Sequence, residues 1–235
     1  MMEAIILAGG FGTRLRQVVS DVPKPMAPIN EIPFLVYIFN WLNKYNVTHV
    51  VLAVGYKKEI IMDYFGKKYK NIDIDYSVED TPLFTGGAIK QALNECREDN
   101  IFIINGDTFF DVNLEKLLAQ HIKLNADFTI SVKEMKDFDR YGIVKINENK
   151  EVIGFEEKKY HEKGYINGGI YCIKKDLLNK ISKPTFSFEK DYMEKYYLKD
   201  DIKAYFSDSY FIDIGIPEDY SKAQIDLKNY LIKDK

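Results

Sequence analysis

Apolar runs typical of buried strands alternate with amphipathic helical patterns through the first half of this 235-residue chain. The strand candidates are 4–8, 48–54, 72–77 and 101–105, and the helix candidates are 34–44, 58–65, 87–96 and 114–124. Because crossover helices return a chain to parallel strands, this order predicts an α/β fold. We expect one Rossmann-like domain whose mixed, mostly parallel central sheet is flanked by helices, with a ligand cleft at the carboxyl ends of the strands.

Strand candidates crowd together beyond residue 126, without the helices that separate them earlier. They cover residues 127–134, 142–146, 152–155 and 165–173, with a turn at 147–150, and a final helix starting at Pro217 runs to the C-terminus. No linker rich in Pro, Gly or Ser and no internal repeat interrupts the sequence. We therefore expect a single domain over residues 1–235, with halves 1–125 and 126–235 sharing one sheet.

Three glycines, Gly9, Gly10 and Gly12, follow the first strand candidate directly. Glycine lets a backbone approach a ligand closely with its N–H groups exposed, and Arg14 and Lys24 can meet phosphate from two sides. This segment predicts a site for a nucleoside triphosphate, although the glycines alone also fit an ordinary tight turn. It matches neither the Walker A pattern nor the Gly-x-Gly-x-x-Gly fingerprint of dehydrogenases.

Charge and composition narrow the choice of partners. The 33 Lys and Arg residues against 36 Asp and Glu give a net charge of -3, which provides no electrostatic footprint for nucleic acid or an anionic membrane. Cys96 and Cys172 lie far apart and outside metal-binding spacing, and no apolar run is long enough to span a membrane, so we expect a reduced, cytoplasmic protein. The sequence leaves open whether the chain forms a homo-oligomer.

The complete string of residues 9–15, GGFGTRL, followed by residues 23–29, PKPMAPI, resembles the signature of the sugar-1-phosphate nucleotidyltransferases. The resemblance covers nearly the whole chain, with motifs in order from residue 7 to residue 220. It implies catalytic roles for Arg14 and Lys24 and a nucleotide-binding half in residues 1–125. The implied nucleotide contacts are Leu7, Ala8, Gly9, Gly10, Gly12, Thr13, Arg14, Lys24, Glu79, Thr85 and Gly86. The chain departs from the family at Phe84, where the base-pocket segment has glycine.

Two aspartates at strand ends resemble the metal ligands of the same family. Asp107 follows the strand candidate 101–105, and Asp213 ends the apolar run 211–212. Two carboxylates, together with phosphate oxygens and water, make the hard octahedral site that Mg²⁺ prefers, whereas a softer metal would ask for Cys or His. The resemblance therefore implies Mg²⁺ as the cofactor.

The sugar-phosphate side is expected in residues 126–235. Glu157 and Lys158 follow the strand candidate 152–155, and Gly142, Asn167 and Gly168 belong to neighbouring strands. A charged triplet on its own is typical of a solvated surface. In this context it resembles the family's Glu-Lys pair, which implies that Glu157 accepts hydrogen bonds from sugar hydroxyls and that Lys158 holds the sugar phosphate.

The implied reaction transfers a nucleoside monophosphate to a sugar 1-phosphate and releases pyrophosphate. Within the family, the segment 21–28 and the short chain most resemble members that use GTP and a manno-configured heptose 1-phosphate. This resemblance implies that substrate pair, with Glu79 as an acceptor for the guanine edge. Guanylyl transfer to mannose 1-phosphate and thymidylyl transfer to glucose 1-phosphate stay open as alternatives. A metal-dependent glycosyltransferase would be expected to carry Asp-x-Asp, which residues 106–109 lack.

Overall fold

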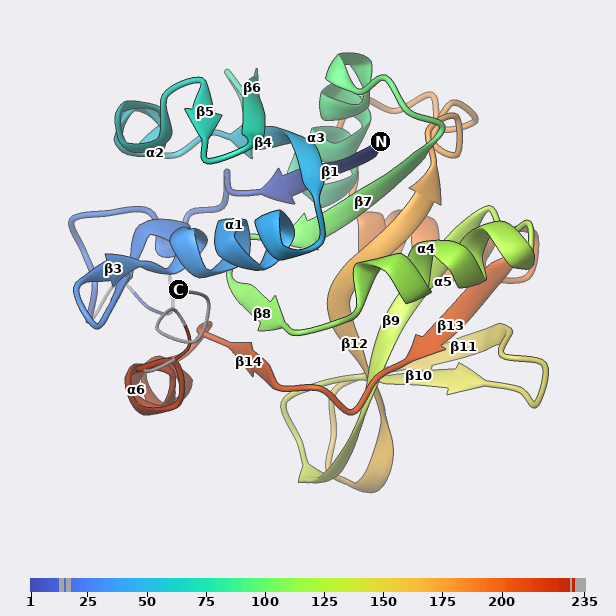
Figure 1. Ribbon diagram of the computed structural model, residues 1–235. Coiled ribbons are helices and arrows are strands. Elements are labelled where there is room, and N and C mark those ends of the chain that lie inside the picture. Colours follow the sequence, from blue (N-terminus) through green and yellow to red (C-terminus); the bar gives the residue numbers. More distant parts are fainter. Residues whose placement is uncertain (13–14, 16–17, 229, 231–235) are drawn as a thin grey trace.

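A computed structural model describes residues 1–12, 15, 18–228 and 230 and shows helices on both faces of a central sheet (Figure 1). Four parallel strands form the core of that sheet, with a short fifth strand at its edge. They are β1 (Met2–Leu7), β4 (Val47–Val54), β6 (Ile72–Val78), β7 (Asn100–Asn105) and the edge strand β5 (Lys68–Tyr69). The four predicted strands of the first half are thus confirmed, with ends that shift by one or two residues.

The strands of the second half continue the same sheet beyond β7. They are β9 (Phe128–Phe138), β10 (Ile143–Ile146), β11 (Val152–Glu156), β12 (His161–Lys174) and β13 (Ile202–Phe206). The order is β11-β10-β12-β7-β1-β4-β6-β5, with β9 paired to both β12 and β13. Strand β12 joins the two halves because it pairs antiparallel with β7 and with β9. The mixed, largely parallel sheet confirms the predicted fold class.

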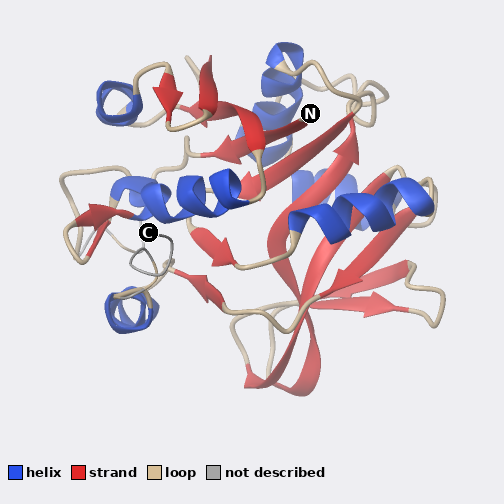
Figure 2. Ribbon diagram, in the orientation of Figure 1, coloured by secondary structure: helices blue, strands red, loops and turns tan. Residues whose placement is uncertain are grey.

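Helices cover the two faces unequally, as Figure 2 shows. One face, reached by Ala4 and Ile6, packs against α1, α2, α4 and α6, whereas the other, reached by Ile5, packs against α3 and the π-helix η3. These elements are α1 (Phe34–Lys44), α2 (Lys58–Phe65), α3 (Phe84–Ala92), α4 (Leu114–Lys123), η3 (Phe188–Met193) and α6 (Pro217–Asp226). Helix α3 differs from the helix predicted over residues 87–96. It begins three residues before Gly87, and the 3-10 turn Leu93–Glu95 follows its end.

A small two-stranded ribbon lies beside the main sheet. Strand β8 (Thr108–Phe110) follows β7 almost directly and pairs antiparallel with β14 (Phe211–Asp213). The register places Asp213 opposite Thr108, the neighbour of Asp107. Two aspartates that are distant in the sequence therefore come to one end of the sheet.

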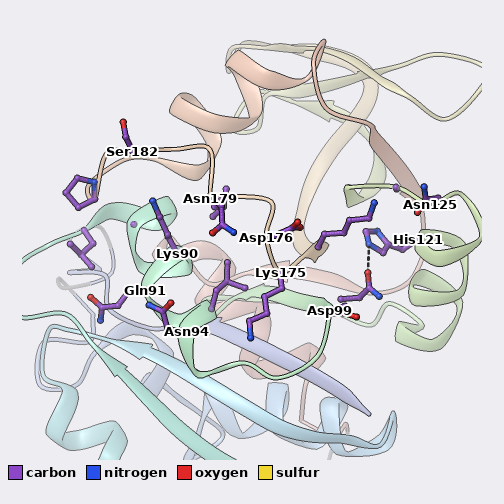
Figure 3. Close-up of a pocket in the computed structure, with 18 of the residues that line it drawn as sticks. Lys90, Gln91, Asn94, Asp99, His121, Asn125, Lys175, Asp176, Asn179 and Ser182 are labelled. Carbon is purple, nitrogen blue, oxygen red and sulfur yellow. Dashed lines mark hydrogen bonds between the residues drawn. The ribbon is translucent and has the colours of Figure 1, made fainter.

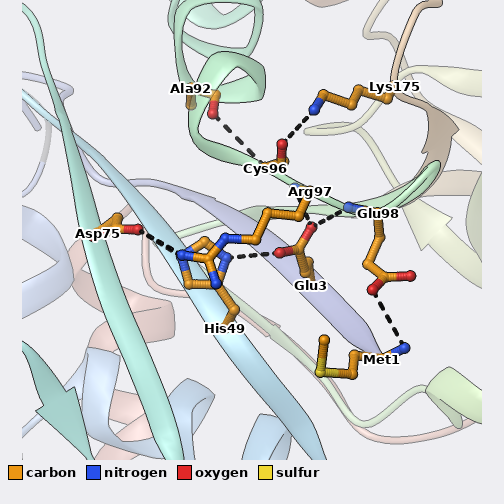
Figure 4. A network of polar contacts seen from close by, with 9 residues as sticks. All are labelled: Met1, Glu3, His49, Asp75, Ala92, Cys96, Arg97, Glu98 and Lys175. Atoms are coloured by element: carbon orange, nitrogen blue, oxygen red, sulfur yellow. Dashed lines mark hydrogen bonds and ion pairs between the residues drawn. The ribbon is translucent and has the colours of Figure 1, made fainter.

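A buried polar network fastens the opposite end of the sheet (Figure 4). Glu3 on β1 is only 3% exposed, and its carboxylate accepts the N–H groups of Arg97 and Glu98, both at 2.7 Å. Its other oxygen lies 2.9 Å from Nδ1 of His49, whose Nε2 lies 2.9 Å from Asp75. The network joins β1, β4 and β6 to the loop that leads into β7.

Replacing Glu3 by Gln should destabilise the protein at neutral pH. Burial raises the pKa of Glu3, but hydrogen bonds from the backbone of Glu98 and Arg97 and from His49 outweigh it, so the pKa falls below its ordinary value of 4.5. We expect Glu3→Gln to lower the free energy of unfolding by about 1–3 kcal/mol at pH 7, since an amide satisfies these donors less well than a carboxylate. A lowered carboxyl pKa contributes stability above 4.5 that is lost as pH falls through the folded value, so the gap between the two proteins should shrink in acid.

Urea unfolding of both proteins between pH 7 and pH 3 measures this gap. Glu162→Gln is the matched control, because Glu162 is exposed and its carboxylate makes no hydrogen bond or ion pair with another described residue. Equal stability of Glu3→Gln and wild type at pH 7, or a gap that widens in acid, would contradict this role of Glu3.

Candidate active site

A cavity of about 600 Å³ opens at the carboxyl ends of the parallel strands. Its wall is formed by the ends of β1 and β7 and by the loops that follow β1, β4 and β6. Nine of the predicted site residues line it: Leu7, Ala8, Gly9, Gly10, Gly12, Lys24, Glu79, Thr85 and Asp107. The cavity therefore brings together most of the predicted nucleotide contacts with one of the two predicted metal ligands.

The glycine loop lines this cavity and packs closely against Glu79 and Lys24. A Cβ atom on Gly9 would lie 2.5 Å from Oε1 of Glu79, so a side chain there would displace that carboxylate. Gly12 has a φ of +58° and lies against the side chain of Lys24, whereas a Cβ on Gly10 would meet open space. Thr13 and Arg14, predicted to act beside these glycines, lie outside the described residues.

Lys24 holds the two predicted metal ligands together. It begins the 3-10 turn η1 (Lys24–Met26) between two prolines, which restrict the backbone on either side. Its side chain is 10% exposed, with Nζ 2.5 Å from Oδ2 of Asp107 and 3.7 Å from Oδ1 of Asp213. We call these three residues the Lys24 cluster. One ammonium between two carboxylates leaves a net charge of -1, which suits a further cation.

Backbone contacts fix both aspartates of the Lys24 cluster. The N–H of Gly106 donates to the Leu7 carbonyl at 3.0 Å, which ties the Asp107 segment to the end of β1. The carbonyl of Asp107 accepts the N–H of Ile214, and Oδ1 of Asp213 accepts the N–H of Gly215 at 2.8 Å. Among the described residues, no group of three or more His, Cys, Asp and Glu side chains could hold a metal ion. A metal at this site would thus take further ligands from substrate or water.

Glu79 contributes a half-buried carboxylate to the cavity. Its Oε2 accepts the N–H of Leu83 at 2.9 Å, while Oε1 faces Gly9. Burial raises the pKa of Glu79, and the hydrogen bond from Leu83 offsets only part of that effect. The carboxylate is positioned to accept hydrogen bonds from a ligand in the cavity.

The segment around Thr85 is held by the π-helix. The hydroxyl of Thr85 donates to Oε2 of Glu189 at 2.7 Å and accepts the N–H of Phe188 at 2.9 Å. Glu189 also lines the cavity and was missed by the sequence analysis, because nothing in its neighbourhood marks a π-helix. Gly86 does not line the cavity: its N–H donates to the Phe186 carbonyl at 2.9 Å and its Cα lies against the Phe186 ring.

The predicted sugar-phosphate residues lie outside this cavity. Glu157 and Lys158 follow β11, are exposed, and make no side-chain hydrogen bond or ion pair with any other described residue. Asn167 donates to the Tyr171 hydroxyl at 2.8 Å and accepts the N–H of Gly169 at 2.9 Å. A Cβ on Gly168 would lie 2.5 Å from the ring of Phe110 on β8, which places β12 against the ribbon that carries the aspartates.

Gly142 marks another close approach of two backbones. A Cβ there would lie 2.3 Å from the carbonyl oxygen of Glu156, so only glycine fits between β10 and the end of β11. The structure thus gathers Gly142, Glu157 and Lys158 at neighbouring strand ends. It does not place them in contact with the Lys24 cluster.

Arg140 was not predicted as a site residue, and it lies beside Tyr141, the neighbour of the predicted Gly142. Arg140 forms an ion pair with Asp219 at 2.7 Å and lies over the ring of Tyr141. Burial raises the pKa of Tyr141, and the nearby carboxylates of Asp213 and Asp219 raise it further, which shows how close this ring lies to the Lys24 cluster. The sequence offered one signal, because Arg140 is one of only four arginines in the chain.

A second cavity of about 930 Å³ lies at the amino end of β7, away from the glycine loop (Figure 3). Its lysines already have partners within the described structure: Lys90 donates to the Ile181 carbonyl and Lys175 to the Cys96 carbonyl. His121 lies between Thr129 and Asn100, and burial lowers the pKa of His121 to about 4. This larger cavity is polar but internally bonded, and it lacks the paired carboxylates found around Lys24.

No helix among the described residues is both long and apolar enough to cross a bilayer.

Comparison with known proteins identifies the family of this chain. The sequence profile of the nucleotidyl transferase family matches residues 3–229. The chain is 53% identical over 231 residues to D-glycero-alpha-D-manno-heptose 1-phosphate guanylyltransferase of Aneurinibacillus thermoaerophilus, covering 98% of this chain and 100% of that protein. It is 48% identical over 220 residues to the protein of the same name from Campylobacter jejuni subsp. jejuni serotype O:2, covering 93% and 97% respectively.

Solved structures give the same result. HddC from Yersinia pseudotuberculosis is 38% identical, with a TM-score of 0.88 and coverage of 96% of this chain and 99% of that chain. A crystal structure of HddC complexed with GMP-PN matches with a TM-score of 0.87, the same identity and the same coverage. The chain therefore belongs to the nucleotidyl transferase family.

Proposed function

We propose that this protein transfers the guanylyl group of GTP to D-glycero-α-D-manno-heptose 1-phosphate and releases pyrophosphate. The observation that carries the proposal is the Lys24 cluster at the glycine-lined cavity, with Nζ of Lys24 2.5 Å from Asp107 and 3.7 Å from Asp213. This arrangement suits a reaction between two polyanions, which must be held in line while their charge is neutralised. The two guanylyltransferases of nearly the same length, 53% and 48% identical to this chain, support the substrate pair.

The nucleotide half is assigned to residues 1–125. The N–H groups at Gly9, Gly10 and Gly12 would face the triphosphate, with the charges of Lys24 and Arg14 beside them. Glu79 would accept the N1–H and exocyclic amine of guanine, since its half-buried carboxylate lines the cavity.

Mg²⁺ is assigned to Asp107 and Asp213. The two carboxylates already share one positive charge, and oxygen ligands of this kind match the preference of Mg²⁺. When bound there, the ion would supply positive charge to the phosphate oxygens. Lys24 would turn its ammonium toward the phosphates of the bound nucleotide, whose negative charge attracts it.

The sugar-phosphate half is assigned to residues 126–235. Lys158 would hold the sugar phosphate as a point charge, and Glu157 would accept hydrogen bonds from sugar hydroxyls. Gly142, Asn167 and Gly168 would shape this end of the site. Both charged side chains are exposed and make no hydrogen bond or ion pair with other described residues, so they would be available to a ligand.

The chemistry needs no protein nucleophile. An oxygen of the sugar phosphate attacks the α-phosphorus of GTP; this new P–O bond forms as the bond to the bridging oxygen of the β-phosphate breaks, and pyrophosphate leaves. The attacking oxygen is already anionic, so no general base is required. The protein's own task is to align the two substrates and offset their repulsion.

A pyrophosphate-release assay that crosses four nucleoside triphosphates with several sugar 1-phosphates tests the proposal directly. We expect GTP with the manno-configured heptose 1-phosphate to give the highest kcat/KM. A faster reaction of thymidine triphosphate with glucose 1-phosphate, or of GTP with mannose 1-phosphate, would overturn the substrate pair. The absence of pyrophosphate release with every combination would overturn nucleotidyl transfer itself.

Removal of Lys24 should abolish most activity without unfolding the protein. Lys24→Ala is expected to lose about 3–4 kcal/mol of transition-state stabilisation, as for one preorganised electrostatic group, which is a fall in kcat/KM of roughly 10²–10³-fold. Lys67→Ala is the control, because Lys67 is exposed on the loop after α2 and is not among the residues that line the cavity. If folded Lys24→Ala kept turnover within threefold of wild type, the role assigned to Lys24 would be wrong.

Removal of Lys158 should weaken the use of the sugar 1-phosphate without weakening the binding of GTP. Lys158→Ala is expected to raise the KM for the sugar 1-phosphate by about tenfold or more, the value of one charge-assisted contact, while the Kd for GTP stays within about twofold. Steady-state rates and calorimetry measure the two effects. The neighbouring variant Lys159→Ala removes a lysine that pairs with Glu156 at 3.1 Å and should change neither value. Equal losses for both substrates in Lys158→Ala would refute this division.

A further inference from the structure

Phe84 has an unusual backbone conformation at the start of α3. Its φ is +56°, in the left-handed region that bulky side chains rarely adopt. The other non-glycine residues with positive φ in the described chain are Asn, Asp, Glu or Lys, so Phe84 is the only apolar one. The family signature has glycine at this position, where such a φ carries no steric cost. The phenylalanine therefore needs a reason of its own.

Packing within the folded protein does not explain why Phe84 adopts a positive φ. The Phe84 side chain is 66% exposed, and its ring forms no aromatic pair with any other described residue. It lines the 600 Å³ cavity instead of packing into either hydrophobic core. Residues with strained backbone conformations are concentrated at active sites and ligand sites. There the strained backbone can hold a side chain in the position that contacts the ligand.

Other aromatic rings line the same cavity. Phe11 in the glycine loop is 52% exposed, and its ring centroid lies 5.5 Å from that of Tyr56 in the loop after β4. Both residues line the cavity together with Phe84. Aromatic surface thus comes from three separate segments.

The position of Glu79 connects this aromatic surface to base recognition. Oε2 of Glu79 accepts the N–H of Leu83, the residue directly before Phe84. A carboxylate that can hydrogen-bond to the edge of a base is therefore held by the residue next to Phe84. The exposed ring of Phe84 can in turn cover the face of that base. This pair of groups would bind a planar ligand that has apolar faces and polar edges, as a nucleobase has.

We propose that Phe84 is a stacking platform for the guanine base, with Phe11 and Tyr56 forming a second aromatic surface of the base pocket. This inference rests on the proposed function, and it adds a specificity-determining residue where the family signature has glycine. Stacking favours the larger face of a purine, while Glu79 selects its edge.

Calorimetric titration of wild type and Phe84→Gly with GTP and Mg²⁺, without sugar phosphate, tests the inference. We expect Phe84→Gly to bind GTP about tenfold more weakly, the loss typical of one stacked base. Binding of inorganic tripolyphosphate, which has no base, should stay within twofold. The melting temperature of the free protein should not fall, because glycine relieves the positive φ.

Two further variants complete the test. Phe84→Trp keeps an aromatic face and should bind GTP within threefold of wild type. Tyr160→Ala removes an aromatic side chain of similar exposure, 65%, that lies outside the cavity, and should leave GTP binding unchanged. Unchanged GTP affinity in Phe84→Gly, or an equal loss for tripolyphosphate, would overturn the stacking role. Because no sugar phosphate is present, these results are independent of whether the transfer reaction itself occurs.

Discussion

The ammonium of Lys24 between the carboxylates of Asp107 and Asp213 is the interaction on which the rest of the site depends. Two carboxylates from distant segments would repel one another without a cation between them. Several features hold them there: the β8–β14 ribbon sets the register of Asp213 against Thr108, and prolines flank Lys24. The side chain of Lys24 also lies against Gly12, so one residue connects the two aspartates to the loop proposed to bind phosphate.

The two ends of the sheet have opposite characters. At the amino end, Glu3 is buried and its carboxylate is fully engaged by backbone N–H groups and His49, which stabilises the strands. At the carboxyl end, the glycine loop, the Lys24 cluster and Phe84 line an open cavity. Polar groups that are satisfied within the fold stabilise it, whereas those that face the cavity remain available for a ligand. Lys90, Lys175 and His121 of the larger cavity are likewise bonded within the fold, so the smaller cavity is the candidate active site.

Regular elements and the glycine loop were predictable from the sequence because they follow from local pattern. Strands β1, β4, β6 and β7 are apolar runs of the expected length, and Asp107 was predicted to lie at the cleft because it follows one of them. The juxtaposition of Asp107 with Asp213 came from the family resemblance and not from local pattern. The ion pair of Arg140 with Asp219 and the place of Glu189 depend on long-range packing, which no local pattern encodes. The departure at Phe84 was visible in the sequence, but its positive φ was not.

Crystals grown with Mn²⁺ and a non-hydrolysable GTP analogue would test the central claim most directly. The anomalous signal of Mn²⁺ locates the ion independently of any assumption about its ligands. We predict a peak between the carboxylates of Asp107 and Asp213, with Nζ of Lys24 turned from Asp107 toward the triphosphate. A metal bound elsewhere, with Lys24 still bonded to Asp107 beside the bound nucleotide, would contradict the account.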